Sequence, residues 1–192
     1  MGEVSLSCQC GALRGTLTEK TLKSGTHLTC HCKDCRAFQV AVGRDDPGAI
    51  DGVRIVQIGP GGMAITQGVE HLAALRLSPR GPLRFYAACC GTPIATTPSK
   101  LSIPFAGLLA DMVEHQDALG RVRAQVNITQ PDGKVTHKRM GRVVMALFSN
   151  AGAAILKGER KKTPFFDAET GRPVVDPVVI DKVRKAEIYA RL

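Results

Sequence analysis

Short stretches of alternating apolar and polar positions follow one another through the first hundred residues. Pro- and Gly-containing turns such as Gly59-Pro60-Gly61-Gly62 separate them. A period of two places successive side chains on opposite faces of a strand, so the pattern predicts short, half-buried β-strands in an antiparallel arrangement. We expect strands and turns over residues 1–35, strands at 38–43, 53–58, 63–66, 72–77 and 83–86, and a polar loop at 44–52.

Beyond residue 120 the pattern changes. The turn Pro131-Asp132-Gly133 lies between apolar stretches at 122–129 and 135–137, which predicts a hairpin. Apolar residues then recur at helical spacing from Met140 to Leu156, and Gly158 is a plausible end of this helix. We expect the helix to pack on the sheet as core. A second, short helix is predicted within residues 177–192.

Composition narrows the class of protein. The 192 residues are 44% hydrophobic and 22% charged, which excludes a disordered chain. No apolar stretch reaches the roughly 18 residues that span a bilayer, and the first residues lack the pattern of a secretory signal. We therefore expect a cytoplasmic protein without a membrane partner, in which cysteines stay reduced and do not form a disulfide framework.

The seven cysteines gather in three groups, and none lies in the last hundred residues. Buried structural cysteines scatter through a core, so this grouping favours a metal site over isolated or redox-active thiols. The groups are Cys8 and Cys10, then Cys30, Cys32 and Cys35, and finally Cys89 and Cys90.

The spacing within these groups suits zinc. Residues two apart in an extended segment point to the same face, and a Cys-x-x-Cys turn returns two sulfurs to one point. Gly11 and Gly91 each follow a cysteine, where a positive φ or a close backbone approach is often needed. We expect one or, more naturally, two zinc ions. A strained disulfide between Cys89 and Cys90 is an alternative.

A division into four and three sulfurs follows from the count. Cys8, Cys10, Cys89 and Cys90 would form a closed, structural site. The sulfurs of Cys30, Cys32 and Cys35 would leave one position of a tetrahedral ion open to water or substrate, as in catalytic zinc sites.

The cysteine motifs resemble those of the glutathione-dependent formaldehyde-activating enzyme family, which includes centromere protein V. The similarity covers roughly residues 5–110. A set of bacterial proteins of unknown function with a C-terminal extension is more similar still. It shares the sequence from Cys32 to Phe38 and that from Arg84 to Cys90.

The resemblance implies a mainly β, Mss4-like fold of twisted antiparallel sheets with zinc knuckles. We expect an Mss4-like zinc-binding β domain over residues 1–115. A hairpin and helical, α-containing C-terminal extension over residues 116–192 would pack on it.

The resemblance also implies two zinc ions and a carbon–sulfur lyase type of chemistry. One position departs from the family pattern, because Ala87 stands where the family has a cysteine and Cys89 is additional. Three alternatives follow. Cys89 supplies the fourth sulfur of the structural site, that site has three protein sulfurs, or Cys89 and Cys90 bind different ions.

An open zinc would take glutathione or another small thiol as its substrate and hold it as a thiolate. Lys33 and Arg36 could attract a carboxylate of that substrate, and His27 and His31 could transfer protons or replace a ligand. The catalytic residues are not predicted beyond the metal ligands.

Two non-catalytic hypotheses remain beside the enzyme. One is a zinc-stabilised module that binds another macromolecule, and the other is a thiol-based redox sensor. The net charge of +9 favours an anionic partner. Basic groups occur near Lys134–Arg142 and at residues 157–162, including Arg160. Aromatic residues are scarce, which makes nucleic acid an unlikely partner.

Overall fold

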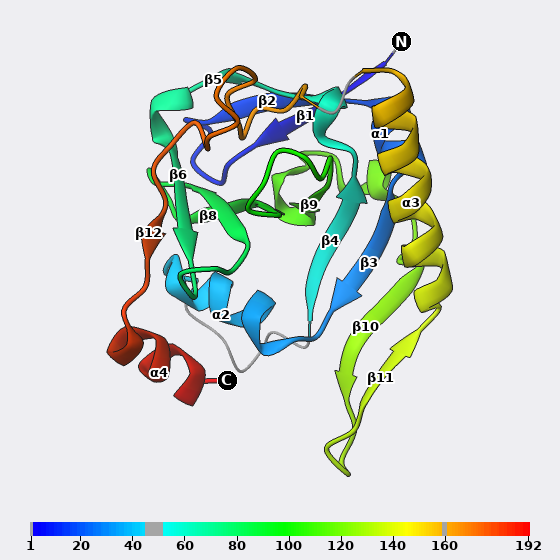
Figure 1. Ribbon diagram of the computed structural model, residues 1–192. Helices are drawn as coiled ribbons and strands as arrows, with labels where there is room; N and C mark the ends of the chain where they lie inside the picture. The colour runs from blue at the N-terminus through cyan, green and yellow to red at the C-terminus, as the bar shows by residue number, and fades with distance from the viewer. Residues whose placement is uncertain (1, 45–51, 159–160) are drawn as a thin grey trace.

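The computed structural model describes residues 2–44, 52–158 and 161–192, so most of the predicted loop at 44–52, and Arg160, lie outside the described residues. Two β-sheets form the framework (Figure 1). The smaller has the order β1-β2-β5, and the larger has the order β11-β10-β3-β4-β9-β8-β7-β6-β12. The prediction of a mainly β fold is confirmed.

The small sheet consists of β1 (Glu3–Ser7), β2 (Arg14–Thr18) and β5 (Met63–Gln67), all antiparallel. Six strands form the centre of the large sheet with antiparallel pairs. They are β3 (Thr26–Cys30), β4 (Val53–Ile58), β9 (Ala106–Leu109), β8 (Thr92–Thr97), β7 (Leu83–Ala87) and β6 (Leu72–Arg76).

The segment after residue 116 adds strands at both ends of the large sheet. At one end β10 (Ala124–Thr129) pairs parallel with β3 and antiparallel with β11 (Val135–Lys138), which confirms the predicted hairpin. At the other end β12 (Val178–Val179) pairs parallel with β6. The large sheet is therefore mixed at its two ends. The boundary between residues 115 and 116 stays a prediction.

Alternating residues of the large sheet enter two cores. In β4, Val56 and Ile58 face the core that lies against the small sheet, while Val53 and Ile55 face the core on the opposite side. The second core is covered by α2 (Lys33–Ala41) and α4 (Lys182–Ala190), and α4 contributes the fully buried Ile188. This period of two is the one that the sequence pattern indicated.

The predicted strand at residues 38–43 is wrong, because these residues belong to α2 and the turn after it. Cys32 caps the helix by accepting a hydrogen bond from the backbone N–H of Cys35, and Asp34 places a negative charge in the first turn. The helix ends before Gly43, which has a φ of +86°. Phe38 and Val40 are both buried. A short apolar run of this kind fits a buried strand as well as a buried helix, which is why the sequence pattern was misleading.

The long C-terminal helix is confirmed as α3 (Met140–Leu156), and the short terminal helix as α4. The expectation that α3 is core needs correction, because none of its residues is buried. It lies against β3, β4 and β10 and leaves its outer side exposed. The sequence missed the short helix α1 (Glu19–Ser24), which Thr18 caps. None of the helices that the structure describes has the length and apolarity to cross a membrane.

Candidate metal centres

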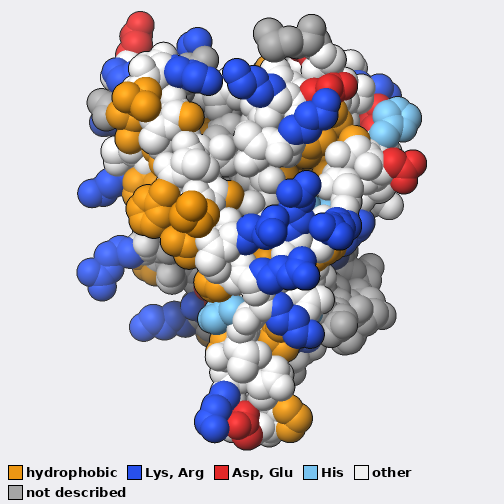
Figure 2. All heavy atoms as spheres, turned by 90° about the vertical axis from the view of Figure 1, so that its right-hand side faces the viewer, with side chains coloured by type: hydrophobic (Ala, Val, Ile, Leu, Met, Phe, Trp, Pro, Cys, Tyr) orange, Lys and Arg blue, Asp and Glu red, His pale blue; other side chains and the backbone are white. Residues whose placement is uncertain are grey.

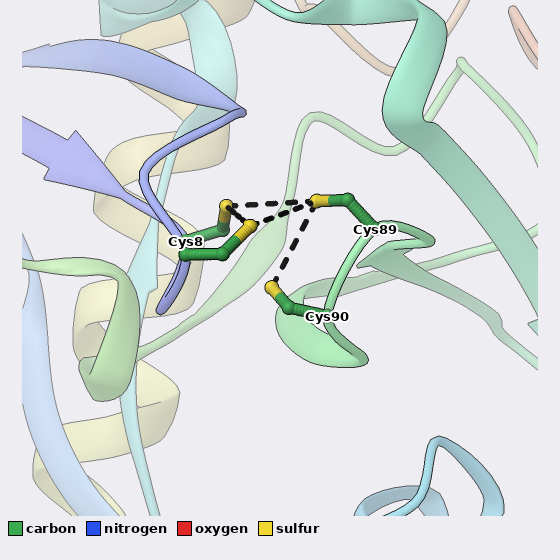
Figure 3. A group of neighbouring side chains, drawn as sticks. Cys8, Cys89 and Cys90 are labelled. Atoms are coloured by element: carbon green, nitrogen blue, oxygen red, sulfur yellow. Dashed lines mark hydrogen bonds between the residues drawn. The ribbon is translucent and has the colours of Figure 1, made fainter.

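Four cysteines from two turns converge between the sheets. Cys8 and Cys10 lie in the turn that joins β1 to β2 of the small sheet, and Cys89 and Cys90 lie in the turn that joins β7 to β8 of the large sheet. Figure 3 shows the side chains of Cys8, Cys89 and Cys90 pointing toward one another. We call this group the first cluster. The first cluster therefore brings a turn of the small sheet into contact with a turn of the large sheet.

The sulfur spacing of the first cluster fits one tetrahedral ion. The Sγ–Sγ distances are 3.6 Å for Cys8–Cys10, 3.8 Å for Cys8–Cys89, 3.4 Å for Cys10–Cys89 and 3.8 Å for Cys89–Cys90. A zinc ion with Zn–S bonds of about 2.3 Å requires sulfurs roughly 3.8 Å apart. All four sulfurs lie within 4.8 Å of one another. Both Cys89 and Cys90 belong to this group, which matches the first of the three alternatives.

Backbone groups shape both turns of the first cluster. The N–H of Leu13 donates to Sγ of Cys8 over 3.3 Å. Gly11 and Gly91 have φ values of +77° and +70°, as their positions after a cysteine predict. A Cβ on Gly91 would lie 2.1 Å from the carbonyl oxygen of Val42, at the end of α2. The first cluster therefore contacts the helix that carries the second group of cysteines.

Thr92 connects the two turns from a buried position. Its Oγ1 accepts a hydrogen bond from the backbone N–H of Gln9 over 3.0 Å and lies 3.1 Å from Sγ of Cys90. Partial burial acts to raise the pKa of Cys90, but the hydrogen bonds from Thr92 and the Cys10 backbone outweigh it and lower the pKa to about 6. Desolvation and the neighbouring sulfurs raise the pKa of Cys89.

The other three cysteines form a second cluster at the junction of β3 and α2. Cys30 is the last residue of β3, Cys32 is the N-cap of α2, and Cys35 lies in the first turn of that helix. Their sulfurs lie within 4.8 Å of one another, with 3.4 Å between Cys30 and Cys32. The cap geometry explains the motif, since the same bond that starts the helix also holds one sulfur in place.

The three sulfurs of the second cluster shift one another's pKa in opposite directions. Hydrogen bonds from Cys32 and Cys35 lower the pKa of Cys30 to about 2. The resulting thiolate raises the pKa of both Cys32 and Cys35. Metal ligation by sulfur requires the deprotonated form, which the lowered pKa of Cys30 favours.

Asn127 is a further neighbour of Cys30 that the sequence analysis missed. Its Nδ2 donates to Sγ of Cys30 over 3.4 Å, and its backbone N–H donates to Nδ1 of His137. Asn127 lies at the irregularity between Gln125 and Ile128 of β10 and has a φ of +57°. Asparagine tolerates this left-handed backbone better than most residues, and the irregularity directs its amide to a sulfur that could hold a metal ion. No local motif marks it, because it contacts Cys30 from 97 residues away.

His27 and His31, which the sequence analysis considered as proton-transfer groups or replacement ligands, do not join either cluster among the described residues. Nδ1 of His27 hydrogen-bonds the carbonyl oxygen of Gly120 over 3.0 Å. His31 has its Nε2 buried without a hydrogen-bond partner, and its backbone N–H donates to Val126. Within the described part of the chain, the second cluster therefore offers three candidate metal ligands and no fourth.

The charged residues beside the second cluster lie in two settings. Lys33 is exposed at the first turn of α2. Arg36 donates to the backbone oxygen of Leu192 over 3.0 Å, so part of its guanidinium contacts the C-terminal segment. The Tyr189 hydroxyl of α4 hydrogen-bonds Asp34, and desolvation followed by this carboxylate raises the pKa of Tyr189. The helix α4 thus borders the second cluster.

Comparisons with known proteins match most of the chain to one family model. The model is described as a family of unknown function (DUF6151) and matches residues 1–176. No curated protein matches the chain. A crystal structure of a Rhodobacter sphaeroides protein is similar to it with a TM-score of 0.42 and 17% sequence identity, over 62% of this chain and 96% of that one.

Proposed function

The chain belongs to the DUF6151 family, and from that premise we propose that it is a cytoplasmic protein with two zinc sites of different kinds. The first cluster is a closed structural site, and the second cluster is an open site that binds a small thiol. The observation that carries the proposal is the unequal number of cysteines in two groups of otherwise similar spacing.

The choice of zinc follows from the ligands. Thiolates select soft or borderline metals, and four sulfurs at the edges of a tetrahedron suit zinc or an iron–sulfur centre. The backbone donors to Cys8 and Cys32 support a zinc knuckle, since an N–H to a ligating sulfur fixes its orientation. Zinc in the first cluster would connect a turn of the small sheet to one of the large sheet.

The reaction that we propose for the second cluster resembles that of the glutathione-dependent formaldehyde-activating enzymes. Zinc, when bound there, lowers the pKa of a small thiol at the free position and favours its thiolate. In the reaction the thiol sulfur adds to the carbonyl carbon of formaldehyde. An S–C bond forms, the C=O π bond breaks, and the oxygen takes up the proton that the sulfur loses. The reverse reaction is that of a carbon–sulfur lyase.

Residues of this chain have separate tasks in that proposal. Cys30, Cys32 and Cys35 hold the metal. The amide of Asn127 stabilises the negative charge on Cys30 and positions its sulfur. Lys33, which is exposed beside the cluster, attracts the carboxylate of an anionic thiol such as glutathione.

An assay with zinc-loaded protein, glutathione and formaldehyde tests the proposal. We expect S-hydroxymethyl adduct to form faster than in the same solution without protein. Cys35→Ser should abolish the difference, because a ligand of the open site is lost. The matched Cys10→Ser variant alters only the first cluster and should retain activity per folded molecule. Equal adduct formation with and without protein, across several thiols, would rule out this chemistry.

A non-catalytic function is the second candidate, and the exposed outer side of α3 favours it. Both zinc ions would then only stabilise loops, and the protein would act through its surface. The two functions differ in the second cluster. A binding module tolerates a bulky thiol reagent at the free position of that zinc without loss of function, whereas the enzyme does not.

A further inference from the structure

The helix α3 is apolar on its outer side as well as on the side that contacts the sheet. No charged residue occurs between Val143 and Leu156. Five large apolar side chains, which we call the α3 ridge, are 41–89% exposed: Val144, Met145, Phe148, Ile155 and Leu156. A helix that is hydrophobic all round is normally covered on all sides.

The ridge runs along the side of α3 that faces away from the protein. The helix contacts β3, β4 and β10 with its inner side. Helical periodicity places the ridge residues on the opposite arc, because they follow one another at spacings near four and eleven. Phe148 is 71% exposed and Leu156 is 89% exposed, so these side chains project into solvent and do not line a groove. Figure 2 shows apolar side chains gathered on this face of the molecule.

Positive charge accompanies the ridge. Residues 133–158 contain no Asp or Glu. Four exposed cations, which we call the basic flank, lie near its ends: Lys138, Arg139, Arg142 and Lys157. None of the four forms a side-chain ion pair with any acidic residue in the described part of the chain. Lys134 is not counted, since it pairs with Asp132 over 3.2 Å. Figure 2 shows Lys and Arg side chains beside the apolar ones on one face.

The combination of an exposed apolar ridge and a basic flank indicates what kind of partner binds this surface. A second copy of the chain would bring two basic flanks together, which costs electrostatic free energy. A groove on a partner would have to receive a helix that is already fixed against a sheet. An anionic bilayer surface accepts both parts at once, because apolar side chains enter the boundary between headgroups and acyl chains while Lys and Arg contact phosphates.

We propose that the α3 ridge and its basic flank dock this protein on an anionic lipid surface, with α3 parallel to the bilayer. The helix is about 25 Å long, which is enough to lie along the interface. The expectation of no membrane partner rested on the absence of a spanning segment, and an interfacial helix does not need one. The ridge and the basic flank contain no cysteine, so the proposal does not depend on metal in either cluster.

A single introduced tryptophan can report whether the ridge inserts into the bilayer, because the chain has no Trp of its own. In Phe148→Trp, we expect the emission to shift to shorter wavelength when vesicles of phosphatidylcholine and phosphatidylglycerol are added. Pure phosphatidylcholine vesicles should give no shift. The matched control is Val183→Trp, since Val183 is 70% exposed and belongs to α4, which lies on the opposite side of the view from α3 in Figure 1. A shift in the control, or none in Phe148→Trp, would overturn the proposal.

Flotation with the same vesicles measures the affinity. The variant with Met145→Ser and Phe148→Ser should bind at least about tenfold more weakly, because burying one large apolar side chain is worth more than the ~1.4 kcal/mol of a tenfold change. Val183→Ser should bind like the unmodified protein, and all three should contain the same amount of zinc. Unchanged binding by the double variant would overturn the proposal. So would a dimer, detected by light scattering, that the double variant dissociates, because the ridge would then bind a second copy.

Discussion

Close approach of two backbones at Gly91 joins the first cluster to the end of α2. In Gly91→Ala, the new methyl group would meet the Val42 carbonyl oxygen at 2.1 Å, and the φ of +70° would be strained. We expect the free energy of unfolding to fall by roughly 2 kcal/mol or more, as measured by chemical denaturation. Gly133→Ala is the matched control, because Gly133 has a φ of +80° with nothing within 4 Å. It should lose only about 1 kcal/mol. Equal losses would show that the contact with Val42 is unimportant.

The hydroxyl of Thr92 lies 3.1 Å from Sγ of Cys90 and is one of the groups that lower the pKa of this thiol. In chelator-treated protein, alkylation of Cys90 should remain fast at pH 7 and slow as the pH falls through about 6, the pKa of this thiol. Thr92→Val removes a hydrogen bond to the thiolate, so its pKa rises and the midpoint moves to higher pH. Mass spectrometry of the Cys90 peptide gives both midpoints. A midpoint that does not move in Thr92→Val would contradict the role of the hydroxyl.

Cys32 is both the N-cap of α2 and a member of the second cluster. Cys32→Ser and Cys32→Ala both remove one sulfur from the second cluster, but serine can still accept the hydrogen bond from the Cys35 backbone. Cys32→Ala should therefore be less stable than Cys32→Ser by about 1 kcal/mol, and its α2 amides should exchange hydrogen faster. Both variants lose the same ligand, so their difference isolates the cap. Identical stabilities would mean that Cys32 serves only as a ligand.

Sequence patterns predicted the elements unevenly, for physical reasons. The strands β4 to β7 follow from period-two alternation, and the β10–β11 hairpin follows from its Pro-Asp-Gly turn. The helix α2 was mistaken for a strand, because a short apolar run fits either element and its cap is a cysteine. In α3 the helix was predicted correctly. Its exposure could not be predicted, since an apolar pattern does not say which face the sheet covers.

The candidate site was predictable only where its members are neighbours in sequence. Spacing grouped all seven cysteines and indicated the division into four and three. Thr92 follows Cys90 by only two residues, but no motif distinguishes it from the other threonines of the chain. Asn127 was missed because the pairing of β10 with β3 brings it to Cys30 from 97 residues away. A contact such as that of Asn127 depends on the register of the sheet and leaves no spacing signature in the chain.

The last helix, α4, lies beyond residues 1–176, which the family model matches. It nevertheless packs against the second core of the protein. Ile188 of α4 is fully buried against that core. Ile188→Ala should lower the free energy of unfolding by about 2 kcal/mol or more, because it leaves a cavity. Val183→Ala, at a position that is 70% exposed on the same helix, should change it little. If thermal unfolding of the two variants were the same, α4 would not be part of the cooperative fold.

The two sheets and the two cysteine clusters form one connected arrangement. The first cluster joins a turn of each sheet, Gly91 connects it to α2, and α2 carries two ligands of the second cluster. Removing metal from the first cluster should therefore loosen the whole protein, whereas removing it from the second should act locally. The helix α3 packs on the large sheet, but its ridge contains no residue of either cluster and stays exposed.

Zinc content, combined with X-ray absorption on the purified protein, reports on the two cysteine clusters together. We predict close to two zinc ions per chain. Seven cysteines shared by two ions give an average of 3.5 sulfur ligands per zinc, with the remainder an oxygen or nitrogen neighbour. In Cys35→Ser the protein should retain one zinc with four sulfurs. A single zinc in the unmodified protein, or none, would contradict the account.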